Sequence, residues 1–202
     1  MQTNAICIAR EFGSGGHEIG VKVAAALGLK VYEKELLHMA CRYGDVAEQT
    51  LQRADERATN PLLFQGVFEG NHHVTRGLPT SEVLFALQSH EIKRIARRES
   101  CVFVGRCADY VLQDEPNVHL LRVFVHAPTE QRIQRKMQQE RLSRDKAARL
   151  VKKMDKQRRH YYEHYTGHPW GDPQFVDLRI DAGAVELSDA ADRIVQQYAQ
   201  LS

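Results

Sequence analysis

The sequence of 202 residues has no apolar run of the about eighteen residues that a membrane-spanning helix needs. Its four cysteines form no Cys-x-x-Cys pair, which excludes the usual thiol redox and metal-binding motifs. The formal net charge of only +2 excludes a chain that binds nucleic acid through its overall charge. The first residues also lack the basic segment and apolar core of a secretory signal. We therefore expect a cytoplasmic protein with free thiols and with neither a membrane nor a nucleic-acid partner.

The composition is otherwise that of a globular protein. Hydrophobic residues make up 43% of the chain and charged residues 27%, both close to ordinary values. The length suits one packed domain and is short for two, so residues 1–202 are predicted to form a single domain. Predicted strands and helices alternate along the chain, which indicates an α/β fold with a parallel sheet covered on both sides.

A pattern of strand, glycine loop and helix occupies residues 4–27 and follows the chain's first apolar run. Glycine lacks a Cβ, so such a loop can turn its N–H groups toward one point, where the N-terminus of the next helix favours an anion. A glycine cluster that only permits a turn is the alternative. The residues predicted to bind a phosphate-bearing cofactor are Arg10, Gly13, Ser14, Gly15, Gly16, His17 and Glu18.

The loop departs from the standard P-loop, which ends in Gly-Lys-Ser/Thr. Gly16 stands at the lysine position, and His17 and Glu18 follow it where a hydroxyl is expected, which removes a cation and a magnesium ligand. Arg10 or His17 could supply the cation, and Glu18 could reach a metal ion through water. The hydroxyl of Ser14 adds a hydrogen-bond donor.

Two further strand ends carry candidate ligand-binding residues. Glu33 follows a predicted strand at 29–32, on the edge where open α/β sheets bind ligands, although it could equally stabilise the next helix. An apolar strand at 100–104 leads into Gly-Arg, and the Arg106 guanidinium can hold two phosphate oxygens in a fork. Asp109 can accept a hydrogen bond from an amino or hydroxyl group, unless it pairs with Arg106.

Residues 42–98 read as an interrupted helical insertion, with an apolar patch at 62–68 that suits packing or a homodimer contact. Beyond the next strand, at 120–125, two helices form a basic hairpin. Its simplest interpretation is a solvated surface. Its basic residues are Arg132, Arg135, Lys136, Arg141, Arg144, Lys146, Arg149, Lys152, Lys153, Lys156, Arg158 and Arg159.

An aromatic segment follows the basic hairpin. His160, His164 and His168 are spaced four apart, but Gly167 interrupts the helix before the third, so no metal site is expected there. Tyrosines 161 and 162 and Trp170 are instead predicted to pack the hairpin onto the core or to shape a nucleotide pocket.

The order of these motifs, from Ala5 to Leu201, resembles the cytidylate kinase-like family of P-loop nucleoside-monophosphate kinases. The resemblance implies a three-layer α/β/α fold with about five parallel strands, a helical monophosphate-binding insertion at about 42–98 and a basic lid at about 128–170. It also implies transfer of the ATP γ-phosphoryl group, with Mg²⁺, to a nucleoside monophosphate such as CMP or dCMP. The alternatives are a nucleotide-binding regulatory module with little or no catalysis and, less in keeping with the charge, a nucleic-acid-binding protein.

The resemblance also implies roles for individual residues. Arg106 matches the arginine of a Gly-Arg-Asp motif that touches the monophosphate, Cys107 stands where the aspartate would be, and Asp109 is an approximate substitute, so Glu33, Arg106 and Asp109 are the predicted substrate contacts. No metal ligand is assigned to the protein. From spacing alone, Asp155 lies three residues before Arg158 on the same helical face and is expected to hold it. The predicted catalytic residues are Arg106, Arg132, Arg135, Asp155 and Arg158.

Overall fold

The computed structural model describes residues 2–44 and 80–201. Five strands of this part form one parallel sheet in the order β2-β3-β1-β4-β5, which confirms the predicted α/β fold. In register, Ile6 of the central strand lies between Val102 and Leu121 of its two neighbours. The strands are β1 (Thr3–Arg10), β2 (Lys30–Tyr32), β3 (Cys101–Val104), β4 (Val118–His126) and β5 (Leu178–Asp181).

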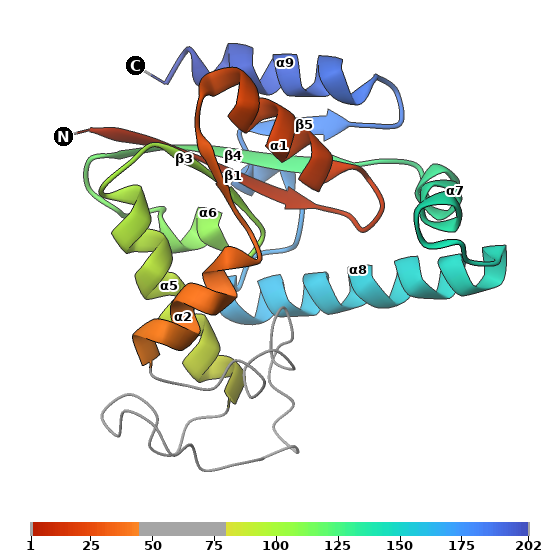
Figure 1. Cartoon of the computed structure of the whole chain (residues 1–202), viewed down its shortest axis with the longest axis horizontal. Coiled ribbons are helices and arrows are strands. Elements are labelled where there is room, and N and C mark those ends of the chain that lie inside the picture. Colours follow the sequence, from red (N-terminus) through yellow and green to blue (C-terminus); the bar gives the residue numbers. More distant parts are fainter. Residues whose placement is uncertain (1, 45–79, 202) are drawn as a thin grey trace.

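Helices cover both faces of the sheet. Figure 1 shows α1 and α9 on one face and α5, α6 and α8 on the other, so the molecule has three layers. The helices are α1 (Gly16–Leu27), α2 (Glu35–Gly44), α5 (Thr80–Ala96), α6 (Ala108–Val111), α7 (Thr129–Glu140), α8 (Arg144–Thr166) and α9 (Leu187–Tyr198), with a 3₁₀ turn at Pro173–Phe175. None of the helices in the described ranges is long and apolar enough to cross a membrane.

The alternation of side chains along β1 builds two cores. Ile6 and Ile8 pack in a cluster with α1 and α9, whereas Ala5 and Cys7 pack in a second cluster with α5 and α6. All four side chains are buried because a parallel strand in the middle of a covered sheet has no solvent-facing side. The continuous apolar run at the start of the chain is explained by this position.

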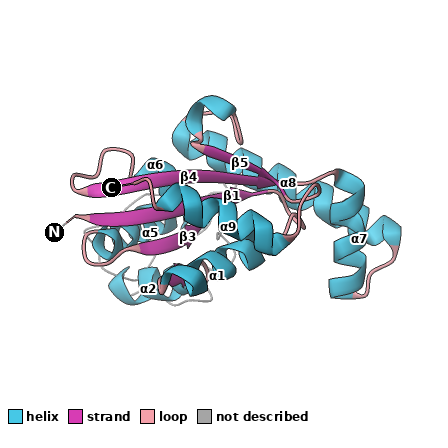
Figure 2. Cartoon of the chain, turned by 90° about the horizontal axis from the view of Figure 1, so that it is seen from above, coloured by secondary structure: helices cyan, strands magenta, loops and turns pink. Residues whose placement is uncertain are grey.

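The order of the strands places the glycine loop at the centre of one edge. From β1 the chain crosses to β2 and β3 on one side, then to β4 and β5 on the other, so a switch point lies at the carboxyl end of β1. Ligands bind at such points because adjacent connections leave the sheet in opposite directions. Figures 1 and 2 place α7 beyond the carboxyl ends of β1 and β4, next to this edge.

The described part of the helical insertion consists of α5, which packs on α2. Leu37, Ala40 and Cys41 of α2 meet Val83, Leu84 and Leu87 of α5 in one buried cluster. The predicted apolar patch at 62–68 lies outside the described residues, and with it the proposed homodimer contact.

Candidate functional site

The loop between β1 and α1 requires glycine at two positions. Gly13 has φ of +82° and Gly15 has φ of +89°, in the left-handed region that residues with a Cβ rarely adopt. A Cβ at residue 13 would lie 2.9 Å from the carbonyl oxygen of Arg132, and one at residue 15 only 2.3 Å from Nη1 of Arg135. Helix α7 therefore lies directly against the loop.

A pocket of about 400 Å³ opens beside this loop, at the N-terminus of α1. It contains all the loop residues predicted from the sequence except Ser14, whose buried hydroxyl donates instead to the Glu11 carbonyl oxygen, 2.8 Å away within the loop. The lining, called here the loop pocket, consists of Arg10, Glu11, Phe12, Gly13, Gly15, Gly16, His17, Glu18, Glu33, Arg135, Lys136, Gln139 and Arg158.

Glu33 lies on the ligand edge of the sheet, as predicted, but its carboxylate contacts two cationic groups of the protein. Oε1 accepts a hydrogen bond of 2.6 Å from Nη2 of Arg10, and Oε2 contacts Nδ1 of His17. Neither interpretation from the sequence anticipated these partners. Glu33 therefore fixes the two side chains that the sequence offered as replacements for the P-loop lysine.

The backbone of Phe12 links the loop to α7 and α8. Its N–H donates to Oδ1 of Asp155 at 2.7 Å, and its carbonyl oxygen accepts from Nη1 of Arg132 at 3.2 Å. The same Arg132 nitrogen lies 2.5 Å from Oδ2 of Asp155. The prediction that Asp155 holds Arg158 is thus wrong: the carboxylate faces α7, and within the described residues it binds Arg132 instead.

Arg132 was predicted to be catalytic, and the structure buries this α7 residue between the glycine loop and α8. Its Nε also donates to the carbonyl oxygen of Ala127 at 2.9 Å and lies 3.3 Å from the carboxylate of Glu11. Glu11 in turn accepts a hydrogen bond of 3.1 Å from the Ala127 N–H. Through these contacts Arg132 supports the glycine loop. It lines neither of the two pockets described in this section.

Glu18, at the first turn of α1, also faces α7. Its carboxylate accepts a hydrogen bond of 2.8 Å from Nε2 of Gln139 and lies 3.5 Å from Nη1 of Arg135. The side chain remains 44% exposed, so it is accessible from the loop pocket. Arg135 is therefore held between Glu18 and the glycine loop.

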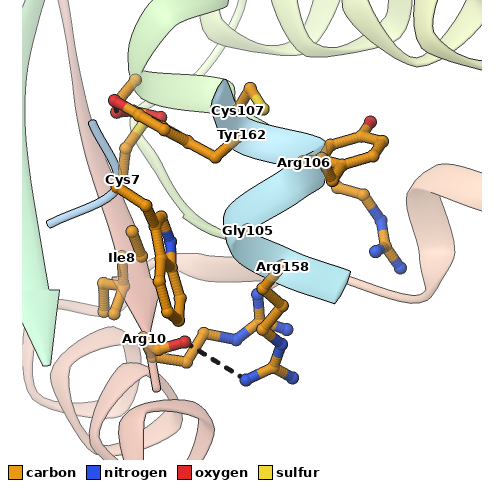
Figure 3. Close-up of a pocket in the computed structure, with 12 residues that line it drawn as sticks. Cys7, Ile8, Arg10, Gly105, Arg106, Cys107, Arg158 and Tyr162 are labelled. Atoms are coloured by element: carbon orange, nitrogen blue, oxygen red, sulfur yellow. Dashed lines mark hydrogen bonds between the residues drawn. The ribbon is translucent and has the colours of Figure 1, made fainter. Parts of the chain in front are cut away.

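A second pocket lies between the end of β1, the turn after β3 and the second half of α8 (Figure 3). It brings together the predicted residues Arg106, Asp109 and Arg158. Both predicted tyrosines and Trp170 line it, which confirms that the aromatic segment shapes a pocket. The lining, called here the acceptor pocket, consists of Cys7, Ile8, Ala9, Arg10, Gly105, Arg106, Cys107, Asp109, Arg158, Tyr161, Tyr162 and Trp170.

The carboxylate of Asp109 is buried in this second pocket and accepts a hydrogen bond of 2.7 Å from the hydroxyl of Tyr162. Burial raises the pKa of Asp109 above its ordinary value, and the hydrogen bond from Tyr162 partly opposes that rise. Burial, with the nearby Asp109 carboxylate, also raises the pKa of Tyr162. Tyr162 is thus the partner seen for Asp109, where the sequence suggested Arg106.

The two pockets share Arg10 and Arg158. Nη1 of Arg158 donates a hydrogen bond of 3.2 Å to the carbonyl oxygen of Arg10, drawn as the dashed line in Figure 3. Two anionic ligands, one in each pocket, would therefore meet beside two guanidinium groups. This arrangement is suited to transferring a charged group from one ligand to the other.

Sequence reasoning missed Phe12 and Lys136. The Phe12 ring packs with Ile133 and Val151 of the α7–α8 hairpin, and Nζ of Lys136 lies 4.5 Å from the centre of the ring. The sequence signal that could have identified Phe12 is its aromatic side chain inside a loop otherwise made of small and polar residues. Such a side chain needs an apolar surface to cover it.

Comparison with known proteins places these features in a family. A model of the cytidylate kinase-like family matches residues 5–184. A solved uncharacterized protein from Eubacterium ventriosum ATCC 27560 is 28% identical, with a TM-score of 0.70 over 98% of this chain and 99% of that chain. A comparison with curated protein sequences found no match.

Two solved kinases share the fold at lower identity. The shikimate kinase from Acinetobacter baumannii has a TM-score of 0.51 at 16% identity, over 98% of this chain and 94% of its own. The gluconokinase from Sinorhizobium meliloti 1021 has a TM-score of 0.53 at 16% identity, over 98% and 93%. At this level of identity the likeness is one of fold.

Proposed function

Because this chain belongs to the cytidylate kinase-like family, we propose that it is a kinase that transfers the γ-phosphoryl group of ATP to a nucleoside monophosphate, CMP or dCMP. The observation that carries the proposal is the pair of pockets joined at Arg10 and Arg158. A kinase needs a site for each substrate and positive charge where the two meet.

The loop pocket is the proposed site of the ATP phosphates. The N–H groups of the loop and the N-terminus of α1 offer hydrogen-bond donors and a favourable dipole to an anion. Arg135 adds a cation from α7, since its guanidinium lies against Gly15. Arg132 and Asp155 do not line the pocket; they hold the backbone of Phe12, which does.

The loop pocket also suits Mg²⁺, which P-loop kinases use together with ATP. This ion commonly takes one or two carboxylates, several waters and the phosphates of the substrate. Glu18 lines the pocket and is accessible, whereas Glu33 is held by Arg10 and His17. Glu18 would therefore hold the ion, which when bound neutralises phosphate charge and orients the phosphates.

The acceptor pocket is the proposed site of the monophosphate. Tyr161, Tyr162 and Trp170 provide aromatic surface for a base. A carboxylate has about four lone-pair sites, so Asp109 can accept a hydrogen bond from the amino group of cytosine while it keeps Tyr162. Cys107 replaces the aspartate expected at this turn, which leaves Asp109 as the buried carboxylate of the pocket.

The chemistry asked of the protein is mainly positioning. Phosphoryl transfer needs the donor and acceptor oxygens in line and compensation for the charge of the moving group. Arg158 and Arg10 lie where the two pockets meet; Arg158 is placed to provide that charge, while the guanidinium of Arg10 is bonded to Glu33. The connection of α8 to the carbonyl of Arg10 keeps the distance between the two sites fixed.

The test is a substrate survey. Purified protein is incubated with ATP and Mg²⁺ and with CMP, dCMP, UMP, AMP or GMP in turn, and with shikimate and gluconate as the acceptors of the two structural relatives. We expect ADP to form with CMP or dCMP, and the corresponding diphosphate to appear. Stabilisation of the protein by nucleotides without ADP formation with any acceptor would reject the kinase and favour a nucleotide-binding regulatory module.

A further inference from the structure

The loop leaves no room for a lysine at the position where a standard P-loop carries one. A Cβ at Gly16 would lie 2.6 Å from Cβ of Arg10 and 3.4 Å from Cβ of Val125. Approaches closer than 3.0 Å require a shift of one of the two segments. The backbone geometry at Gly16 therefore excludes a lysine side chain. A cation that contacts the phosphates must come from another part of the chain.

Arg10 and His17, the two candidate replacements within or next to the loop sequence, are already engaged. Nη2 of Arg10 is bonded to Glu33, and the side chains of this pair are 7% and 13% exposed. Removing Arg10 from a buried carboxylate would leave that charge without its partner, which is costly. His17 contacts the other oxygen of Glu33.

Lys136 approaches the loop from α7. Its Cγ lies 3.3 Å from the Cβ position of Gly13, and its Nζ lies 4.5 Å from the centre of the Phe12 ring. The side chain is only 17% exposed and lines the loop pocket. The aliphatic stem therefore lies along the glycine loop, with the ammonium group over an aromatic ring of the same loop.

We propose that Lys136 takes the place of the missing P-loop lysine and binds the terminal phosphates of ATP. This inference rests on the proposed function, because it assigns a residue to the ATP site of that proposal. It departs from the usual arrangement in that the cation comes from the lid helix α7, about 120 residues after the loop, and not from the loop itself.

The ammonium group is held in place by contacts that a phosphate can replace. Its ion pair with Glu140, at 3.1 Å, joins positions i and i+4 of α7, and pairs of this kind with one exposed partner are weak. Glu140 does not line the loop pocket, so of this pair only Lys136 faces a ligand bound there. An ionised phosphate likewise accepts charge-assisted hydrogen bonds from an ammonium group, so it can replace both present contacts.

The position of Lys136 is also fixed by the Phe12 ring on which it lies. Phe12 is bonded through its N–H to Asp155 and through its carbonyl oxygen to Arg132, and its ring is packed in the α7–α8 cluster. A rigid ring keeps the cation above it in one place, so little order has to be gained when ATP binds.

The first test is direct binding of ATP, measured by titration calorimetry without an acceptor. Lys136→Met keeps the aliphatic stem and removes the charge, and we expect the Kd for ATP to rise at least about tenfold, the effect of losing one charged hydrogen bond. Lys136→Arg should recover most of the affinity. The matched control Lys152→Met, on the exposed face of α8, should bind as the wild type does. Glu140→Gln removes the acid that competes with the phosphate for Lys136, so it should bind ATP at least as tightly as the wild type.

The second test uses the unaltered protein, so it does not depend on the folding of a variant. Amine acetylation followed by mass spectrometry measures the reactivity of each lysine with and without ATP. ATP should protect Lys136 and leave Lys152 as reactive as before. A wild type that binds no ATP would overturn the proposed function, whereas normal ATP binding by Lys136→Met, or an unprotected Lys136, would overturn this inference alone.

Discussion

Arg158 donates a hydrogen bond of 3.2 Å from its Nη1 to the carbonyl oxygen of Arg10, and so joins the middle of α8 to the end of β1. The bond uses the backbone of Arg10, so the side chain of Arg10 remains on Glu33. Both residues line both pockets. The two ligand sites are therefore joined by a contact between α8 and the central strand β1. This contact fixes the place where the two pockets meet.

Replacing Arg158 by Met should affect transfer more than binding. Charge directed at a transferring group acts mainly in the transition state, so the rate of transfer at saturating substrates should fall by about a hundredfold or more. Each substrate keeps its remaining contacts, and the two dissociation constants should change much less. A coupled assay for ADP measures the rate, and calorimetry measures binding.

The matched control for Arg158 is Arg149→Met. Arg149 lies on the same helix, is exposed and lines neither pocket. Its replacement should leave both the rate and the affinities unchanged. Equal losses of rate in the two variants would mean that the general charge of α8 matters and not the position of Arg158.

Gly15→Ala should weaken nucleotide binding, and Gly28→Ala should not. Both residues have positive φ, +89° and +65°, so each alanine should cost about 1–2 kcal/mol of stability. Nothing lies within 4 Å of a Cβ at Gly28, whereas one at Gly15 would displace the guanidinium of Arg135. Urea unfolding measures the common loss of stability, and the shift of Tm with ATP measures the difference in binding.

Asp155→Ala should destabilise the protein through the loop. It removes the acceptor of the Phe12 N–H and the partner of the buried Arg132, and breaking such a pair costs about 3 kcal/mol. The midpoint of urea unfolding should fall accordingly. Glu130→Gln, which breaks an exposed pair with Arg144, should have little effect. A stable Asp155→Ala variant with reduced activity would return Asp155 to a catalytic role.

Local patterns were sufficient to predict the sheet and the loop. Apolar runs bounded by glycine marked β1 and β3, and the turn after each run carried the glycine and arginine residues that now line the pockets. These features depend on residues close together in the chain. Period, turn chemistry and the rule that ligands gather at the carboxyl edge of a parallel sheet predict them without tertiary information.

The partners of charged side chains could not be predicted in this way. The spacing of Asp155 and Arg158 suggested a pair on one helical face, but α7 packs against α8 and offers Arg132 to the same carboxylate. Glu33 meets Arg10 and His17 because the ends of β1 and β2 and the start of α1 converge in space. Such choices depend on which elements face one another, and one sequence read locally does not contain that information.

The buried pair of Asp109 and Tyr162 should make the stability of the protein depend on pH. Because burial raises the pKa of Asp109 in the folded protein, the folded state holds this proton at a higher pH than the unfolded state does. The folded state therefore binds more protons between the two pKa values, and the free energy of unfolding should fall as pH rises from about 4 through the folded pKa.

Asp109→Asn isolates this contribution, since the amide keeps the shape and does not titrate. The free energy of unfolding of Asp109→Asn minus that of the wild type should increase as pH rises from about 4 and become constant above the folded pKa of Asp109. Tyr162→Phe removes the hydrogen bond that lowers the pKa, so it should extend the pH-dependent region to higher pH. Combining both changes should abolish this extension, because no carboxyl group remains. Urea unfolding at a series of pH values provides the measurement, and a difference that stays flat would show that Asp109 is as easily ionised in the folded chain as in the unfolded one.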